Sequence, residues 1–202
     1  SGARKGVWVR VPPPPQNKKH SDYILREYWD SAKCSSKVYN QAVSLILKLL
    51  FWSALAAIIF GFFRTYQMEG SDNQTAFFKG SVPNPLPDGL YEGSVSGPKV
   101  SSKISWLGKK FDASKQTGIN IFKNKTGEQE EKYPFKTYMG KGVRDKEIEV
   151  FKIDYNVPEN PFWLRYILDE VVETAPGEYL GKLQVILIPS YPLTLTFFEL
   201  KK

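Results

Sequence analysis

The residues of this chain whose type and spacing could do chemistry are carboxylates. Asp169 and Glu173 lie four residues apart, with Glu170 beside them. On a helix, two acids at that spacing share one face and could bind a cation or transfer protons. A solvated helix face is the far commoner origin of such a pair. We therefore expect these three acids to be surface charges.

Other catalytic groups are scarce. Asp154 lies in a predicted strand, where we favour an ion pair with Lys152 or Arg165 at the sheet rim. The one histidine, His20, precedes the long apolar segment, so residues 64–202 contain no Cys–His or Ser–His pair and no Cys/His zinc set. The sequence predicts a non-catalytic protein with no cofactor and no metal. An enzyme that uses carboxylates alone is the least favoured hypothesis.

The long apolar segment is residues 42–63, AVSLILKLLFWSALAAIIFGFF, twenty-two residues with one charge. At about 1.5 Å per residue, a helix of this length covers the roughly 30 Å hydrocarbon core of a bilayer. A buried core helix is the alternative, but the absence of charge from Leu49 to Phe63 favours a single membrane span. Basic and aromatic side chains suit interfacial anchors, and we expect this role for Lys48, Trp52, Phe60, Phe63 and Arg64.

Basic residues are concentrated before this segment. Residues 1–41 contain eight Lys and Arg against three acids, whereas residues 64–202 contain nineteen against eighteen. The positive-inside rule then places the N-terminus on the cytoplasmic or matrix side and the C-terminal domain on the outer side. We favour the mitochondrial inner membrane over a secretory-pathway or bacterial membrane. The sequons at Asn73 and Asn124 are weak support for a secretory route. Nucleic-acid binding is not expected, because the C-terminal part is nearly neutral.

The first forty-one residues read as two parts. Residues 1–20 form a basic, Pro-rich arm, in which four prolines favour an extended polyproline II piece that neighbouring subunits would hold. Residues 21–41 fit an amphipathic helix, with Ser21 as its N-cap, lying on the membrane surface or on a partner protein. We expect Cys34 to be an unmodified thiol without a function, and S-acylation is the alternative. Expected partner contacts are Trp8, Pro12, Pro13, Pro14, Pro15, Tyr28 and Trp29.

After the apolar segment we expect a linker over residues 64–88 and a β-rich domain over residues 89–202. Turn-forming residues dominate the linker. Short runs of alternating apolar and polar residues, separated by Gly, Pro and Asn, follow it. One covering helix is predicted over residues 162–173, with Asn160 as its N-cap and Pro161 in its first turn. The fold class is therefore α+β: a transmembrane helix followed by an antiparallel sheet or small barrel. Strands are predicted at residues 90–95, 104–111, 118–122, 133–138, 148–155, 179–188 and 193–200.

Several short motifs in residues 86–202 resemble those of a group of small uncharacterised bacterial proteins. That group looks like a compact β-rich domain without assigned activity. The motifs are Leu86-Pro-Asp-Gly-Leu-Tyr-Glu-Gly, Trp106-Leu-Gly-Lys-Lys-Phe, Lys152-Ile-Asp-Tyr-Asn, Pro158-Glu-Asn-Pro-Phe-Trp-Leu-Arg, Tyr179-Leu-Gly-Lys and Phe197-Phe-Glu-Leu. The first two motifs, through Gly-Leu-Tyr-Glu-Gly and Trp-Leu-Gly-Lys, are also faintly similar to the G-x-W-x-G type of lipocalin-like domain, with Tyr91 in place of Trp. Neither resemblance implies functional residues.

Two functions follow from these patterns. The first is a non-catalytic accessory subunit of a large membrane complex, with other subunits and the lipid bilayer as partners; by analogy with respiratory and ATP-synthase complexes, we favour such a setting. The second is a membrane-anchored β-barrel module that binds a lipid or another hydrophobic ligand. A cavity in the domain favours the second, whereas aromatic side chains that only build the core favour the first.

Overall fold

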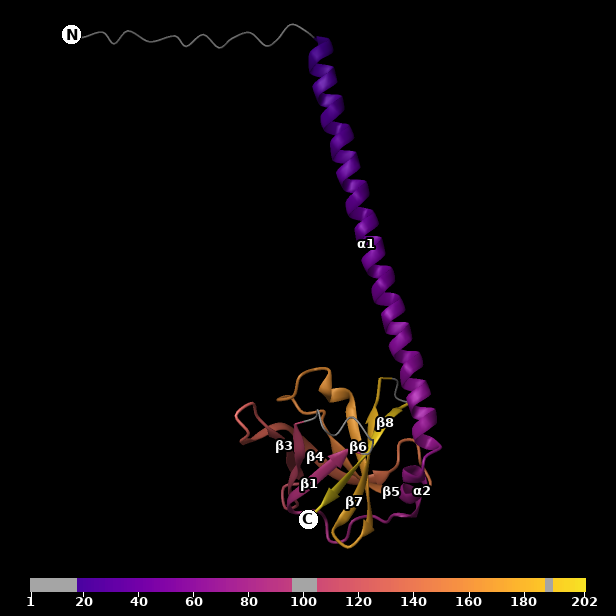
Figure 1. Cartoon of the computed structure of the whole chain (residues 1–202), viewed down its shortest axis with the longest axis vertical. Coiled ribbons are helices and arrows are strands. Elements are labelled where there is room, and N and C mark those ends of the chain that lie inside the picture. The colour runs from indigo at the N-terminus through magenta and orange to yellow at the C-terminus, as the bar shows by residue number, and fades with distance from the viewer. Residues whose placement is uncertain (1–17, 96–104, 188–190) are drawn as a thin grey trace, which may run out of the picture. The chain divides into compact units, whose positions relative to one another are not determined.

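The computed structural model of the chain describes residues 18–95, 105–187 and 191–202 (Figure 1). The chain divides into two compact units, residues 1–55 and residues 56–202. Helix α1 (Lys18–Glu69) begins in the first unit and ends in the second. Helix α2 (Asp72–Lys79) and all eight strands belong to the second unit.

Helix α1 is a single uninterrupted helix of 52 residues. Between Lys37 and Phe60 none of its side chains is buried, although most of them are apolar. Its Lys37–Glu69 stretch is long and apolar enough to cross a membrane, and is the one such helix among the residues described. This is consistent with a single-pass membrane protein. The predicted N-cap at Ser21 is wrong, because the helix already includes Lys18, and no breaker before Gly61 interrupts propagation.

The second unit is built around a closed antiparallel barrel of eight strands, each paired with its neighbour in sequence. Pairing of β1 with β8, from Glu92 opposite Lys201 to Val95 opposite Phe198, closes the barrel. The expected fold class, a helix followed by a small antiparallel barrel, is thereby confirmed. The strands are β1 (Gly89–Val95), β2 (Trp106–Asp112), β3 (Thr117–Lys123), β4 (Gln129–Lys141), β5 (Glu149–Asp154), β6 (Ile167–Ala175), β7 (Glu178–Val185) and β8 (Leu193–Lys201).

The helix predicted over residues 162–173 is wrong. Only one 3₁₀ turn, η1 (Leu164–Tyr166), forms there, and strand β6 follows it directly. Strand β6 is buried on both faces, since Val171 packs inside the barrel and Val172 packs outside it beneath α2. A strand buried on both faces has no apolar–polar alternation, so its apolar residues can mimic helical spacing.

The covering helix of the barrel is instead α2, in the stretch expected to be a linker. Ser71 caps it, accepting a hydrogen bond from the Gln74 amide through its side chain at 3.4 Å. Phe77 of α2 is buried against Phe197 and the neighbouring residues of the outer barrel face. The interior of the barrel is packed separately, with Tyr91, Phe111, Phe135, Phe151, Ile153, Tyr155, Leu164, Val171, Tyr179, Phe198 and Leu200 in one buried cluster.

Candidate functional site

The last two turns of α1 are docked on strand β8, and this junction ties the apolar helix to the barrel. Gly61 allows the close approach, because a Cβ built on it would lie 2.7 Å from Cδ1 of Leu193. One turn later, the buried Thr65 hydroxyl accepts a hydrogen bond from the Thr194 amide at 2.9 Å. Arg64 donates to the Leu195 carbonyl at 3.0 Å. The C-terminal turns of α1, from Gly61 onward, are therefore part of the same packed unit as the barrel.

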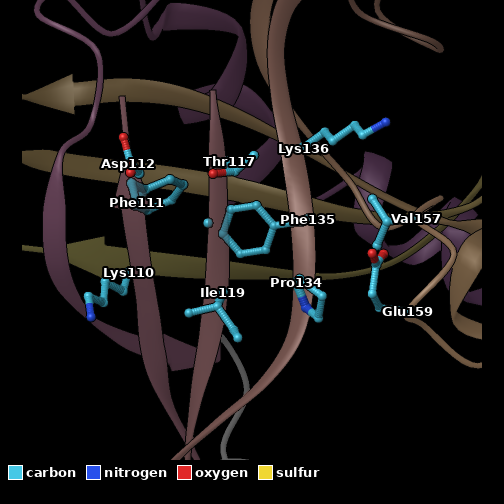
Figure 2. A pocket seen from close by; sticks show the side chains of 11 residues that line it. Lys110, Phe111, Asp112, Thr117, Ile119, Pro134, Phe135, Lys136, Val157 and Glu159 are labelled. Atoms are coloured by element: carbon cyan, nitrogen blue, oxygen red, sulfur yellow. The ribbon is translucent and has the colours of Figure 1, made fainter. Parts of the chain in front are cut away.

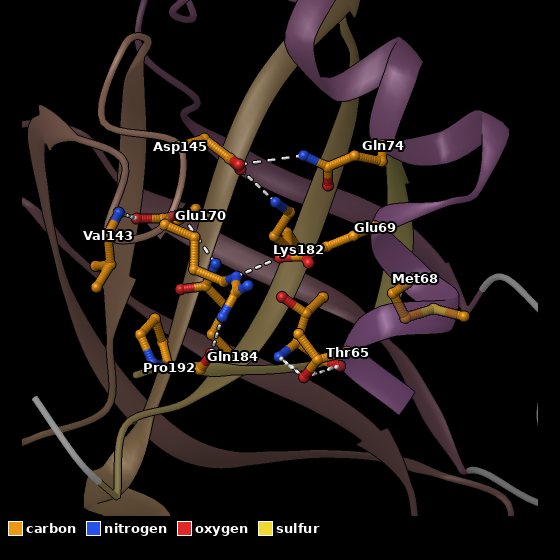
Figure 3. A network of polar contacts seen from close by, with 12 residues as sticks. Thr65, Met68, Glu69, Gln74, Val143, Asp145, Glu170, Lys182, Gln184 and Pro192 are labelled. Carbon is orange, nitrogen blue, oxygen red and sulfur yellow. Dashed lines mark hydrogen bonds and ion pairs between the residues drawn. The ribbon is translucent and has the colours of Figure 1, made fainter. Parts of the chain in front are cut away.

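A buried polar network on the outer barrel face reinforces the junction (Figure 3). Lys182 and Asp145 form an ion pair, and Asp145 also accepts a hydrogen bond from Gln74 of α2 at 3.2 Å. The Lys182 ammonium lies 4.8 Å from the ring centroid of Phe77, a cation–π contact. The β4–β5 loop is thus fastened to both β7 and α2.

The same network reaches helix α1 and strand β6. Arg144 pairs with Glu69 at the end of α1 and donates to the Pro192 carbonyl at 2.9 Å. Glu170 accepts the Val143 amide at 2.6 Å and the Gln184 side-chain amide at 3.2 Å. Burial raises the pKa of Glu170, and the amide of Val143 and the charge of Lys152 oppose this shift. These groups serve as structural ties between the helices, the loop and the barrel.

A second buried ion pair lies inside the barrel. The Lys109 ammonium is 3.0 Å from Oδ2 of Asp169 and donates to Oδ1 of Asn120 at 3.0 Å. Tyr155 joins the cluster through a contact with Lys109 and donates to Asp169 at 3.2 Å. The Trp106 indole donates to Asn120 at 3.1 Å. Among the described side chains, Oδ1 of Asp169 has no hydrogen-bond partner.

Burial shifts the pKa values of the titratable groups in this interior cluster. Desolvation lowers the pKa of Lys109 and raises the pKa of Asp169, and the attraction between the two charges opposes both shifts. Burial also raises the pKa of Tyr155 well above its ordinary value, and the charge of Asp169 adds to this effect. The ring centroids of Trp106, Phe135, Tyr155 and Phe198 all lie within 5.5 Å of the ammonium of Lys109.

The carboxylates singled out from the sequence do not converge. Asp169 lies inside the barrel, whereas Glu170 lies on the outer face. Glu173 is four residues from Asp169 along an extended strand, about 13 Å away, and accepts the Gly177 amide at 3.2 Å. Asp154 accepts the Asn156 amide at 2.8 Å rather than pairing with Lys152 or Arg165. The expectation that these acids lie on a solvated helix face is therefore wrong for Asp169 and Glu170, which are buried in a strand.

A cleft lies over strands β2, β3 and β4, with a volume of about 470 Å³ (Figure 2). Phe111, Ile119, Pro134 and Phe135 form its apolar wall. Charged residues at its edge include Asp112, next to the β2–β3 turn. Hydrogen bonds from the Lys115 ammonium and the Ser114 hydroxyl lower the pKa of Asp112 to about 2. This cleft has the size of a small-ligand site.

The predicted membrane anchors all lie on α1. Lys48, Trp52, Phe60 and Phe63 are exposed on the helix surface. Arg64 is half-buried and binds the Leu195 carbonyl, a partner that the sequence did not suggest.

The predicted partner contacts are mostly outside the described residues. Tyr28 is exposed on α1. The backbone of Trp29 is helical, and its side chain is not described. The remaining predicted contacts, Trp8, Pro12, Pro13, Pro14 and Pro15, lie outside the described residues.

The residues that the sequence reasoning missed are the buried partners, above all Lys109, Asp145 and Lys182. Their types gave no signal, because lysine in a strand and aspartate in a loop are both normally solvated. Within the described residues, no group of three His, Cys, Asp or Glu side chains is placed to hold a metal ion.

Comparison with known proteins adds little to this picture. Neither a protein-family model nor a curated protein matches the chain. One solved structure, a protein from Thermomonospora curvata, is similar over 62% of this chain and 82% of its own, with 14% sequence identity and a TM-score of 0.44.

Proposed function

We propose that this chain is a non-catalytic, single-pass subunit of a larger membrane complex. The observation that carries the proposal is helix α1, whose apolar stretch is long enough to cross a membrane and is not buried, and whose last turns pack on strand β8. An exposed apolar surface of this length needs lipid or protein around it. In this role the chain would tether a folded barrel to a membrane.

The polar groups of the barrel support a structural role. Its buried charges are engaged with each other, as Lys109 is with Asp169 and Lys182 is with Asp145. A catalytic acid or base must reach a substrate, whereas both of these pairs are buried in the packed domain. We place residues 1–41 on the cytoplasmic or matrix side and the barrel on the outer side, with the mitochondrial inner membrane as the favoured location.

The test is the mass and composition of the native particle. The protein is extracted from its own membrane in a mild detergent, with a photo-crosslinking residue at Trp52 or Phe60, two exposed positions of α1. We expect a particle well above the 23.1 kDa of the chain and covalent capture of other membrane subunits. A crosslinker at the exposed Leu90, at the start of β1, serves as the control position. A monodisperse particle containing this chain alone contradicts the proposal.

A ligand-binding module is the second candidate, favoured by the cleft over β2, β3 and β4. The barrel interior itself is occupied by aromatic side chains and the Lys109–Asp169 pair, which is one of the two ways an eight-stranded barrel is filled. Native mass spectrometry of the detergent-released protein separates the two candidates. A co-purifying lipid that is lost when Ile119→Asp places a charge in the cleft supports ligand binding, and a bare chain opposes it.

A further inference from the structure

One end of the barrel can be identified from the direction of α1 along β8. Gly61 contacts Leu193, Arg64 binds the carbonyl of Leu195, and Met68 packs in the cluster around Phe197. The helix and the strand therefore advance in the same direction. Residues Ala56 to Phe60, in the same compact unit, extend past the start of β8. The apolar segment thus leaves the barrel at the end where β8 begins.

Four connections of the barrel share this end, because alternate connections of an up-and-down barrel lie at the same end. Two of them matter here: the β5–β6 loop (residues 155–166) and the described part of the β7–β8 loop (residues 186–187 and 191–192). Of the other two, the β3–β4 turn is polar, with Lys125 and Glu128 exposed. The Ile186 amide donates to the Tyr166 carbonyl at 2.8 Å, which joins the two loops. The β6–β7 turn and the C-terminus lie at the other end.

Exposed hydrophobic residues gather in these two loops. From Gly80 onward, the described residues include eight exposed large hydrophobic side chains, and five of them are in these loops. Exposure reaches 77% for Phe162, 61% for Tyr191 and 53% for Trp163. The guanidinium of Arg165 donates hydrogen bonds to two carbonyls of its own loop, from Nε to Asn160 at 3.0 Å and from Nη2 to Pro158 at 2.5 Å. We call the five residues the aromatic rim: Phe162, Trp163, Tyr166, Leu187 and Tyr191.

We infer that the aromatic rim inserts into the headgroup region of the bilayer that α1 crosses, as a second anchor. Tryptophan and tyrosine concentrate at the membrane–water boundary, where the ring is shielded and its polar atom stays hydrated. Leu193, which follows the β7–β8 loop, contacts Gly61 within the apolar segment, so the rim is held at the depth where that segment ends. The inference depends on the proposed membrane span. A protein partner over the rim is the competing occupant.

The test uses the full-length chain in phosphatidylcholine vesicles, with Cys34→Ser and a single cysteine carrying an environment-sensitive fluorophore. Probe positions are Phe162→Cys and Tyr191→Cys, both strongly exposed, so that the change leaves the core intact. Leu90→Cys at the other end of the barrel is the matched exposed control, and Ile59→Cys reports the span. Headgroup-labelled quencher lipids should quench the probes at 162 and 191 several-fold more than the probe at 90.

Two other results are decisive. Rim probes as hydrated as the probe at 90, beside a lipid-buried probe at 59, overturn the rim inference and leave the span intact. Rim probes that are hydrated in the vesicles but shielded in native membranes also overturn the rim inference, because a protein and not lipid then covers the rim. A hydrated probe at 59 contradicts the proposed function itself.

Discussion

Lys109 on β2 and Asp169 on β6 form an ion pair of 3.0 Å inside the barrel, where both side chains are almost fully buried. Strands β2 and β6 are not neighbours in the barrel, so this pair joins opposite sides of it. Loss of one partner leaves a buried charge without compensation, which is far more costly than loss of both.

Asp169→Leu and Lys109→Met should therefore each lower the free energy of unfolding by about 3–5 kcal/mol. The double variant should lose much less than the sum of the two. Urea unfolding of the full chain in detergent measures these values. Additive losses would contradict a coupled pair.

The turn after β2 should respond to acid. The pKa of Asp112 is about 2 in the folded chain, below the ordinary value of 3.8, because Lys115 and Ser114 donate hydrogen bonds to it. A lowered pKa contributes stability that is fully present above pH 3.8 and is lost as the pH falls through about 2. The stability difference between the native chain and Asp112→Asn should shrink over this window. A difference independent of pH would refute the assignment.

Helix α2 offers a matched pair of neighbouring phenylalanines. Phe77 is completely buried against Phe197, whereas Phe78 is 44% exposed. Phe77→Ala should cost about 3–5 kcal/mol in the free energy of unfolding, as for other buried aromatic residues. Phe78→Ala should change it by less than about 1 kcal/mol. Equal losses from the two variants would show that α2 does not cover the barrel as described.

Gly181 makes room for a ring inside the barrel. A Cβ at Gly181 would lie 2.1 Å from Cζ of Phe198, whereas a Cβ at Gly140 would meet only Lys152 at 3.5 Å. Gly181→Ala should destabilise the chain by about 1–3 kcal/mol through overpacking. Gly140→Ala should be neutral or slightly stabilising. Adding Phe198→Leu to Gly181→Ala should restore part of the loss in thermal unfolding, and failure to do so would refute the steric explanation.

The sequence predicts most of this fold because its strands are rich in β-branched and aromatic residues and most of them end at turn residues. Seven of the eight strands were expected, and β6 was missed because its apolar residues Ile167, Leu168, Val171 and Val172 recur at helical spacing, with one pair on each face of the strand. Helix α2 was missed because it has only eight residues. A capping signal, Ser71-Asp-Asn-Gln, was nevertheless available.

The interior cluster was harder to predict. Strict alternation places Trp106 and Lys109 on opposite faces of β2. A bulge between Trp106 and Gly108 shifts the register, so both side chains point into the barrel. Gly108 accommodates the bulge with a φ of +146°, a conformation that side-chain-bearing residues rarely adopt. No propensity signal shows that shift, so the partner of Asp169 could be found only from the structure.

The central claim is that α1 crosses the membrane and places the barrel on the far side from the N-terminus. The direct measurement is labelling by a membrane-impermeant maleimide in sealed vesicles from cells that express the full chain. The native Cys34 precedes the apolar segment, and a single cysteine in Cys34→Ser/Lys125→Cys follows it in an exposed turn. We expect one of the two cysteines to be labelled from outside, and the other only after the vesicles are permeabilised. Labelling of both from the same side of intact vesicles would contradict the account.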